Sequence, residues 1–169
     1  MVHSIELVFD GATESAIRRI WDDLAHAGIP GQAPASRPHA TLAVAERIAA
    51  DVDKLLSPVS QRLPLQTTIG ATVLFGRAKV VLARLVVPTI ELLALHAEVH
   101  RLCCPHLGPG AMANSVPGQW TPHVTLARRV GGAQLGRALR LAGRPSQIEG
   151  RFVGLRHWDG DKRAEYLIG

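Results

Sequence analysis

The feature that most constrains this chain is a six-residue segment that occurs twice. Residues 38–43 have the sequence PHATLA and residues 122–127 have the sequence PHVTLA, so five of the six positions are identical. The two histidines lie 84 residues apart (123 − 39), which is about half of the 169-residue chain. A repeat at this offset indicates two related halves rather than an array of many short repeats.

Each copy has the pattern of a β-strand that begins at its proline. Polar and apolar residues alternate, so His39 and Thr41 lie on one face of the first strand, and His123 and Thr125 lie on one face of the second. A strand tolerates proline at its first residue, where a missing backbone donor costs least. If the two halves face each other, both imidazoles and both hydroxyls meet in one cleft.

The rest of the chain predicts strands and helices in the same order on both sides of its middle. We expect further strands over residues 3–9, 65–74, 79–87, 147–158 and 163–168. We expect helices from a cap at Thr13 to Gly28, over residues 52–59 and 90–104, and over a short segment after residues 131–132. Loops are expected at residues 31–38 and 107–119, the second long enough to be a lid. The fold class is therefore α+β, and we expect residues 1–169 to form one bilobed domain.

Composition favours a globular protein of the cytoplasm. The content of hydrophobic residues is 47%, which is ample for a core. Cys103 and Cys104 are adjacent and poorly placed to bridge each other, so we expect a reducing compartment. Residues 1–10 lack a basic region followed by an apolar run, so neither a signal peptide nor a membrane span is expected. The net charge of +5 favours a polyanionic partner, and nothing predicts an obligatory protein partner, so we expect a monomer.

Two convergent imidazoles suit a reaction that removes one proton and supplies another. The unperturbed pKa of histidine, near 6.5, lets both protonation states exist near neutrality. Hydrolysis of a cyclic phosphodiester has this requirement, because a water loses a proton while the departing ribose oxygen gains one. The threonine hydroxyls can donate hydrogen bonds to the phosphoryl oxygens as charge accumulates there. This chemistry needs no metal and no cofactor.

The duplicated His-x-Thr-Leu motif resembles that of the two-histidine phosphoesterase superfamily, and more narrowly its bacterial 2′-5′ RNA ligase or RNA 2′,3′-cyclic phosphodiesterase branch. The resemblance implies a duplicated, bilobed fold with two antiparallel sheets flanked by helices around a central groove. It also implies metal-independent cleavage of 2′,3′-cyclic phosphate ends, on RNA or nucleotides, to 2′-phosphates. In that scheme His39 and His123 are the acid/base pair, and Thr41 and Thr125 contact the phosphate. Family members often carry an arginine just beyond the second motif, which matches Arg128.

Several other residues are candidates for binding the substrate. Strict alternation places Arg129, rather than Arg128, on the face of His123, so both are kept. Trp120 is either a base-stacking residue or a buried anchor, and Phe75 lines either the core or the groove. The first strand lacks the arginine and aromatic run of many family members, and with seven aromatic residues in the chain we do not expect an extended stacking platform. A basic groove wall is conceivable from Arg37, Arg77, Lys79, Arg84, Arg128, Arg129 and Arg156.

Other functions remain open at this stage. The same site would serve 2′-5′ RNA ligation, a cyclic phosphodiesterase of small metabolites, or a module that binds RNA ends or nucleotides without turnover. The sequence does not decide which histidine is the base.

A cluster of histidines and cysteines raises the question of a metal. His96 and His100 lie four residues apart, with Cys103, Cys104 and His106 close behind, and such groups are potential zinc ligands. Their order is not that of a zinc protease, so a pair on a helix surface is the favoured interpretation. Residues 159–161 are expected to be solvated turn residues.

Overall fold

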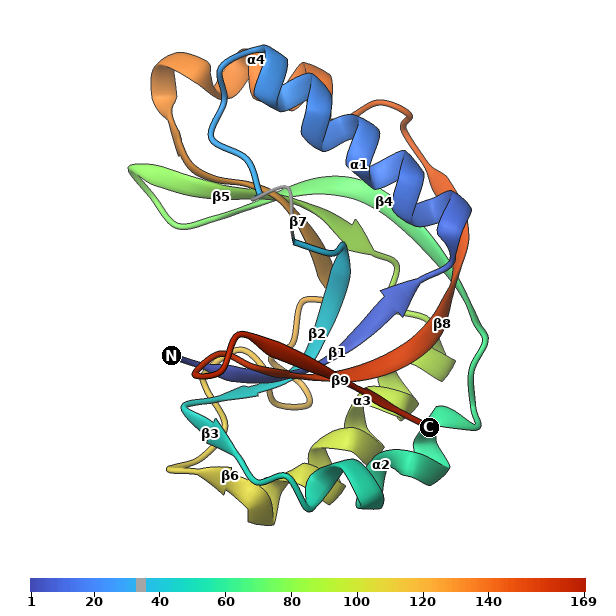
Figure 1. Cartoon of the computed structure of the whole chain (residues 1–169). Helices are drawn as coiled ribbons and strands as arrows, with labels where there is room; N and C mark the ends of the chain where they lie inside the picture. The colour runs from blue at the N-terminus through green and yellow to red at the C-terminus, as the bar shows by residue number, and fades with distance from the viewer. Residues whose placement is uncertain (33–35) are drawn as a thin grey trace.

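The computed structural model describes residues 1–32 and 36–169, and a curved antiparallel sheet of seven strands forms the frame of this part of the chain (Figure 1). Residues 33–35, in the loop expected before the first motif, lie outside the described residues. The strand order is β2-β1-β8-β4-β5-β7, with β9 paired to β8. The strands are β1 (His3–Phe9), β2 (His39–Ala45), β4 (Leu65–Phe75), β5 (Lys79–Val86), β7 (His123–Gly131), β8 (Ile148–Asp159) and β9 (Ala164–Ile168). The short strands β3 (Arg47–Ile48) and β6 (Leu107–Gly108) pair separately.

Strand β8 joins the two halves of the sheet. From Ile148 to Phe152 it pairs with β4, and from Phe152 to Asp159 it pairs with β1. One half therefore consists of β2, β1, β8 and β9, and the other of β8, β4, β5 and β7. The α+β class is confirmed, and the two expected antiparallel sheets are continuous through this shared strand.

Two pairs of helices cover the outer surface of the curved sheet. Helices α1 (Gly11–His26) and α4 (Gly132–Ala142) pack together outside β5 and β7, while α2 (Val52–Ser60) and α3 (Ile90–Cys103) pack together on the other half (Figure 1). A 3-10 turn, η1 (Cys104–His106), follows α3. The helices leave the concave inner surface free, and the motif residues face it. None of the described helices is long and apolar enough to cross a membrane.

Helix starts follow capping side chains. Asp10 caps α1, because its carboxylate accepts from the backbone N–H of Thr13 at 2.9 Å. The expectation that Thr13 is the cap is wrong: its hydroxyl donates to Asp10 at 2.9 Å from inside the first turn. Helix α3 begins where the sequence predicts, since the Thr89 hydroxyl accepts from the backbone N–H of Leu92 at 3.1 Å.

The apolar residues of both motifs anchor the motif strands in the core. Ala40 and Leu42 of β2, and Val124 and Leu126 of β7, are all buried. Because side chains alternate between the two faces of a strand, this burial holds the histidines and threonines on the opposite, concave face. The core therefore fixes the direction in which the polar motif residues point.

Candidate active site

The two motif strands are the two edges of the curved sheet, and the curvature brings them close together (Figure 1). His39, Thr41, His123 and Thr125 all line one cavity of about 700 Å³. The structure thus brings the four residues of the duplicated motif into a single cleft, two from each half of the sheet.

Both histidines are held in the same way. Nδ1 of His39 lies 2.8 Å from the carbonyl oxygen of Arg37, and Nδ1 of His123 lies 2.7 Å from that of Thr121. A carbonyl oxygen only accepts hydrogen bonds, so in each ring Nδ1 carries a proton and donates it. This leaves Nε2 of each imidazole as the nitrogen that gains or loses a proton.

Both motif strands carry a bulge immediately after the threonine. In β2, Thr41 lies opposite Glu6 while Ala43 lies opposite the neighbouring residue of β1. In β7, Thr125 lies opposite Ala83 while Ala127 lies opposite the neighbouring residue of β5. At the motif each strand therefore has one extra residue, so the Leu-Ala pair of each copy is buried and the alternation of faces reverses beyond it. A second register shift follows in β7, opposite residues 80–82 of β5.

The bulge in β7 decides between the two candidate arginines. Arg128 lines the cavity, whereas Arg129 is exposed outside it and has a left-handed backbone with φ of 57°. The prediction that Arg129 lies on the same face as His123 is wrong. It assumed that side chains alternate without interruption, and the bulge breaks that alternation. At the equivalent position in β2, Val44 lines the cavity.

Two tryptophans donate hydrogen bonds to backbone carbonyls of the motif threonines. The indole Nε1 of Trp120 donates to the carbonyl of Thr41 at 3.0 Å, and that of Trp21 donates to the carbonyl of Thr125 at 3.1 Å. Trp120 also stacks on His96, with ring centroids 3.9 Å apart and planes 6° apart. Trp120 therefore anchors β2 and also lines the cavity, and base stacking by its ring stays a prediction.

The surroundings of His123 shift its protonation equilibrium. Phe75, at the end of β4, lines the cavity with its ring centroid 4.6 Å from that of His123. Burial lowers the pKa of His123; the positive charges of His39 and Arg128 act in the same direction, and the bond to the Thr121 carbonyl opposes them. The surroundings of His123 thus favour its neutral form.

His39 lies instead at the end of a row of alternating charges. Its Nε2 is 3.5 Å from Oε1 of Glu6, a buried residue of β1. The Arg156 guanidinium donates to the other oxygen of Glu6 at 2.6 Å and also pairs with Glu165, while its Nη2 lies 3.4 Å from Nδ1 of His39. The Glu6 carboxylate is thus shared between the Arg156 guanidinium and the His39 imidazole.

Sequence reasoning missed Glu6, Ser4 and Trp158, which also line the cavity. The Ser4 hydroxyl donates to Glu6 at 2.6 Å, and both residues lie on the face of β1 that is continuous with the motif face of β2. The sequence pattern that could have identified Ser4 and Glu6 is their alternation with apolar residues in the first strand.

The seven cations considered for a basic groove wall do not gather around the cavity. Arg84 is buried and donates to the backbone carbonyls of Gly70, Ala142 and Ser146. Of the seven cations proposed from the sequence, Arg128 lines the cavity, and Arg156 is engaged with Glu6 behind it.

Helix α3 offers little support for a zinc site. His96 is buried, and its Nε2 lies 2.9 Å from the carbonyl oxygen of Ser115, in the loop that forms part of the cavity wall. Burial raises the pKa of the Cys103 thiol to about 12, which keeps it protonated and a poor ligand. Within the described part of the chain, no group of three potential metal donors includes a residue of α3.

The curved sheet, with paired His-x-Thr strands facing each other across a cleft, defines a fold of the two-histidine phosphoesterase type. The family profile described as the 2′-5′ RNA ligase superfamily matches residues 10–162, and the chain belongs to this superfamily. No curated protein matches the sequence.

Solved structures share the fold at low sequence identity. E. coli LigT, solved in complex with 3′-AMP, is 13% identical with a TM-score of 0.63, over 99% of this chain and 94% of LigT. The protein TT0787 of Thermus thermophilus is 16% identical with a TM-score of 0.61, over 100% of this chain and 96% of its own. The MHV ns2 PDE domain is 16% identical with a TM-score of 0.55, over 99% of both chains.

Proposed function

We propose that this protein is a metal-independent 2′,3′-cyclic phosphodiesterase that converts cyclic phosphate ends of RNA or nucleotides to 2′-phosphates. The observation that carries the proposal is the pair of imidazoles in one cleft, each with Nδ1 bonded to a backbone carbonyl so that Nε2 is the nitrogen that exchanges a proton. Nucleotides are the favoured substrates because LigT has been solved with 3′-AMP, NADP+ and ATP.

The different surroundings of the two histidines support different roles for them. His123, whose pKa is lowered by burial, is the base and takes a proton from the water that attacks phosphorus. His39, beside the Glu6 carboxylate, is the acid and gives its Nε2 proton to the 3′-oxygen as the bond from phosphorus to that oxygen breaks. The products are a 2′-phosphate and a 3′-hydroxyl, and exchange with solvent restores both histidines.

The remaining cleft residues stabilise the charge that develops on phosphorus. The Thr41 and Thr125 hydroxyls are donors on the two sides of the cavity, and the Arg128 guanidinium supplies a positive charge. Phe75, Trp120 and Trp158 provide apolar wall where a base or ribose can lie.

The direct test is incubation of the purified protein, in the presence of a chelator, with a 2′,3′-cyclic mononucleotide and with a short RNA ending in a cyclic phosphate. We expect release of 2′-phosphate ends, with the rate reduced about 10²–10⁴-fold in His39→Ala and in His123→Ala. His26→Ala, which changes an exposed histidine of α1, is the matched control and retains the wild-type rate.

Three outcomes would replace the proposal. A loss below tenfold in both cleft variants would exclude two-histidine catalysis. Binding of a 2′-phosphate product without hydrolysis of either substrate would identify a binding module. A joined product formed with an RNA that carries a 5′-hydroxyl would identify 2′-5′ ligation.

A further inference from the structure

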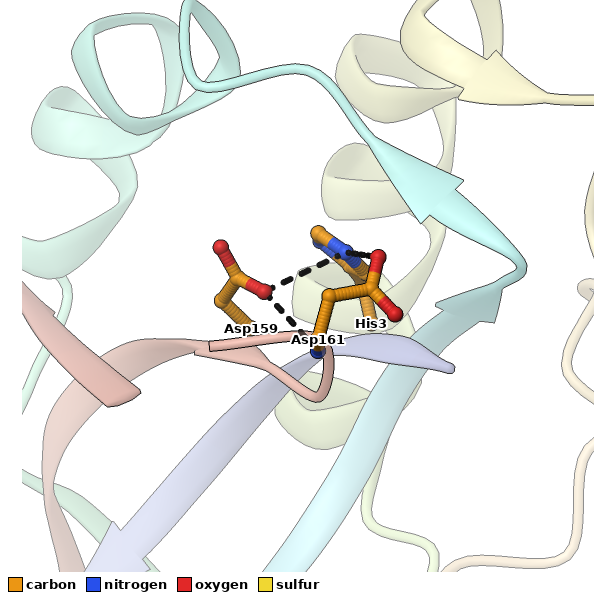
Figure 2. Close-up of side chains that lie close together, drawn as sticks. All are labelled: His3, Asp159 and Asp161. Atoms are coloured by element: carbon orange, nitrogen blue, oxygen red, sulfur yellow. Dashed lines mark hydrogen bonds and ion pairs between the residues drawn. The ribbon is translucent and has the colours of Figure 1, made fainter. Parts of the chain in front are cut away.

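A second cluster of polar side chains lies on the other side of β1 from the cleft. Ser4 and Glu6 line the cleft, whereas His3 points to the opposite face and meets Asp159 and Asp161 from the end of β8 and the turn that follows it (Figure 2). Asp159 is buried, so the expectation that this acidic turn is fully solvated is wrong for it. The cluster plays no part in the proposed hydrolysis.

The three side chains present a convergent set of metal-ligating atoms. Nε2 of His3 is 3.4 Å from Oδ1 of Asp159 and 3.2 Å from Oδ2 of Asp161, and all three ligand atoms lie within 4.8 Å of one another. Zinc binds histidine nitrogen and carboxylate oxygen at about 2.0–2.2 Å, so neighbouring ligands of a tetrahedral zinc lie about 3.3 Å apart. The two separations measured from Nε2 of His3 match that requirement.

The far side of His3 carries a hydrogen-bonded chain that suits a metal ligand. Nδ1 of His3 lies 3.4 Å from Nε2 of His157, and Nδ1 of His157 lies 2.9 Å from Oδ1 of Asp53 on α2. When Nε2 of His3 binds a metal, its Nδ1–H donates to His157, whose own Nδ1–H donates to the Asp53 carboxylate. Metal-binding histidines characteristically have such partners, which fix the orientation of the ring and the position of its proton.

The two carboxylates are also oriented by their surroundings. Oδ1 of Asp159 accepts from the backbone N–H groups of residues 161 and 162, at 3.0 Å each. The Lys162 ammonium lies 3.4 Å from the other oxygen of Asp159, and so does not occupy the position facing His3. The Asp161 side chain is 55% exposed, which leaves a fourth coordination position accessible to water.

We propose that His3, Asp159 and Asp161 form a binding site for one divalent transition metal ion of the zinc class. A bound ion ties the start of β1 to the turn between β8 and β9. Oδ1 of Asp161 already pairs with the N-terminal ammonium of Met1 at 2.7 Å, so the ion would bind the other oxygen, which faces His3. The ion would lie behind the sheet face that carries Ser4 and Glu6. The site has one histidine and two carboxylate ligands with one open position, so zinc and cobalt are suitable probes.

The test measures metal binding in the absence of any substrate, so its result is independent of the phosphodiesterase proposal. Tag-free protein carrying Cys104→Ser, which removes an exposed thiol, is titrated with Zn²⁺ by calorimetry and with Co²⁺ by visible absorption. We expect one equivalent to bind. His3→Gln and Asp161→Asn should each weaken binding at least 100-fold; because Asp161 is exposed, its variant leaves folding intact. Asp53→Asn, outside the coordination sphere, should weaken binding about 10–100-fold.

His39→Ala is the matched control, because it removes a histidine on the cleft side of the sheet, outside the proposed site. Retention of the full affinity in His39→Ala supports the site at His3. The proposal is overturned if the parent protein binds no zinc, if binding is unchanged in both His3→Gln and Asp161→Asn, or if His39→Ala abolishes it.

Discussion

Arg128 and Arg129 are adjacent arginines with different environments. Comparing their variants tests which of the two side chains contributes to activity. Arg128 lines the cleft and Arg129 lies outside it. A charge-assisted hydrogen bond contributes about 1.5–3 kcal/mol, which corresponds to roughly 10–150-fold in kcat/KM. We expect Arg128→Met to lose that much kcat/KM toward a 2′,3′-cyclic nucleotide, and Arg129→Met to stay within threefold. Equal losses in both variants would show that the bulge does not orient this part of β7.

The pKa of His123 makes a second prediction at this scale. The base must be neutral to accept a proton, and burial lowers its pKa from an ordinary value of 6.5. Activity should therefore persist as the pH falls through 6.5, and the acidic limb of the profile of kcat/KM against pH should have its midpoint below that value. In Arg128→Met the midpoint should move upward, because one of the positive charges that lower this pKa is gone. A midpoint above 6.5 would contradict the assignment of His123 as base.

At the residue scale, the sequence predicts the side-chain positions of the residues within the repeated motif. It does not predict positions that are set by pairing with other strands. The alternation in each motif is enough to place His39, Thr41, His123 and Thr125 on two polar faces. The position of Arg128 depends on a bulge that the pairing with β5 reveals. Glu6 reaches His39 through strand pairing between β1 and β2, a contact that no local pattern contains.

At the scale of elements, Arg84 connects parts of the second half that are distant in sequence. It lies in β5 and is 1% exposed, and its guanidinium donates to carbonyls in β4, at the end of α4 and in the segment before β8. Burial lowers the pKa of this arginine, but the three carbonyls offset the cost of its charge. It is thus a structural cation rather than part of the groove wall.

Removing this cation should destabilise the fold. Arg84→Met leaves three acceptors without their donor, each costing about 1–3 kcal/mol, so we expect the free energy of unfolding to fall by at least about 3 kcal/mol. Urea denaturation followed by circular dichroism measures the change. Arg77→Met, at the exposed turn between β4 and β5, is the control and should change stability by less than about 0.5 kcal/mol. A loss under about 1 kcal/mol in Arg84→Met would mean that water replaces the guanidinium.

Local sequence patterns predict the order of the helices and strands along the chain, but they do not predict which strands pair with one another. The cap at Thr89 and the alternation in residues 79–87 placed α3 and β5 close to their observed bounds. The sequence does not show that β8 is shared by both halves, because its two segments pair with strands from opposite ends of the chain. Strand pairing of that kind is set by the packing of the whole sheet.

For the whole molecule, the distribution of charge indicates what length of substrate is recognised. The chain carries 19 Lys and Arg against 14 Asp and Glu, yet among the described residues that line the cleft, Arg128 is the sole Lys or Arg and Glu6 adds a carboxylate. The net charge of +5 is therefore not concentrated in the cleft. We infer that the cleft recognises a terminal cyclic phosphate and makes few contacts with the phosphates that precede it.

Salt dependence measures the number of such contacts. For single strands, log K falls with log salt concentration with a slope of about −0.7 for each phosphate neutralised. Over about 50–300 mM KCl, we expect kcat/KM for a ten-nucleotide RNA with a cyclic phosphate end to show a slope near −0.7. The 2′,3′-cyclic mononucleotide should give a similar slope and a kcat/KM within about tenfold, because both substrates present the same phosphate to Arg128. A slope of about −2 or steeper for the RNA alone would instead mean that basic residues outside the cleft bind the chain, and that the enzyme selects polymers over free nucleotides.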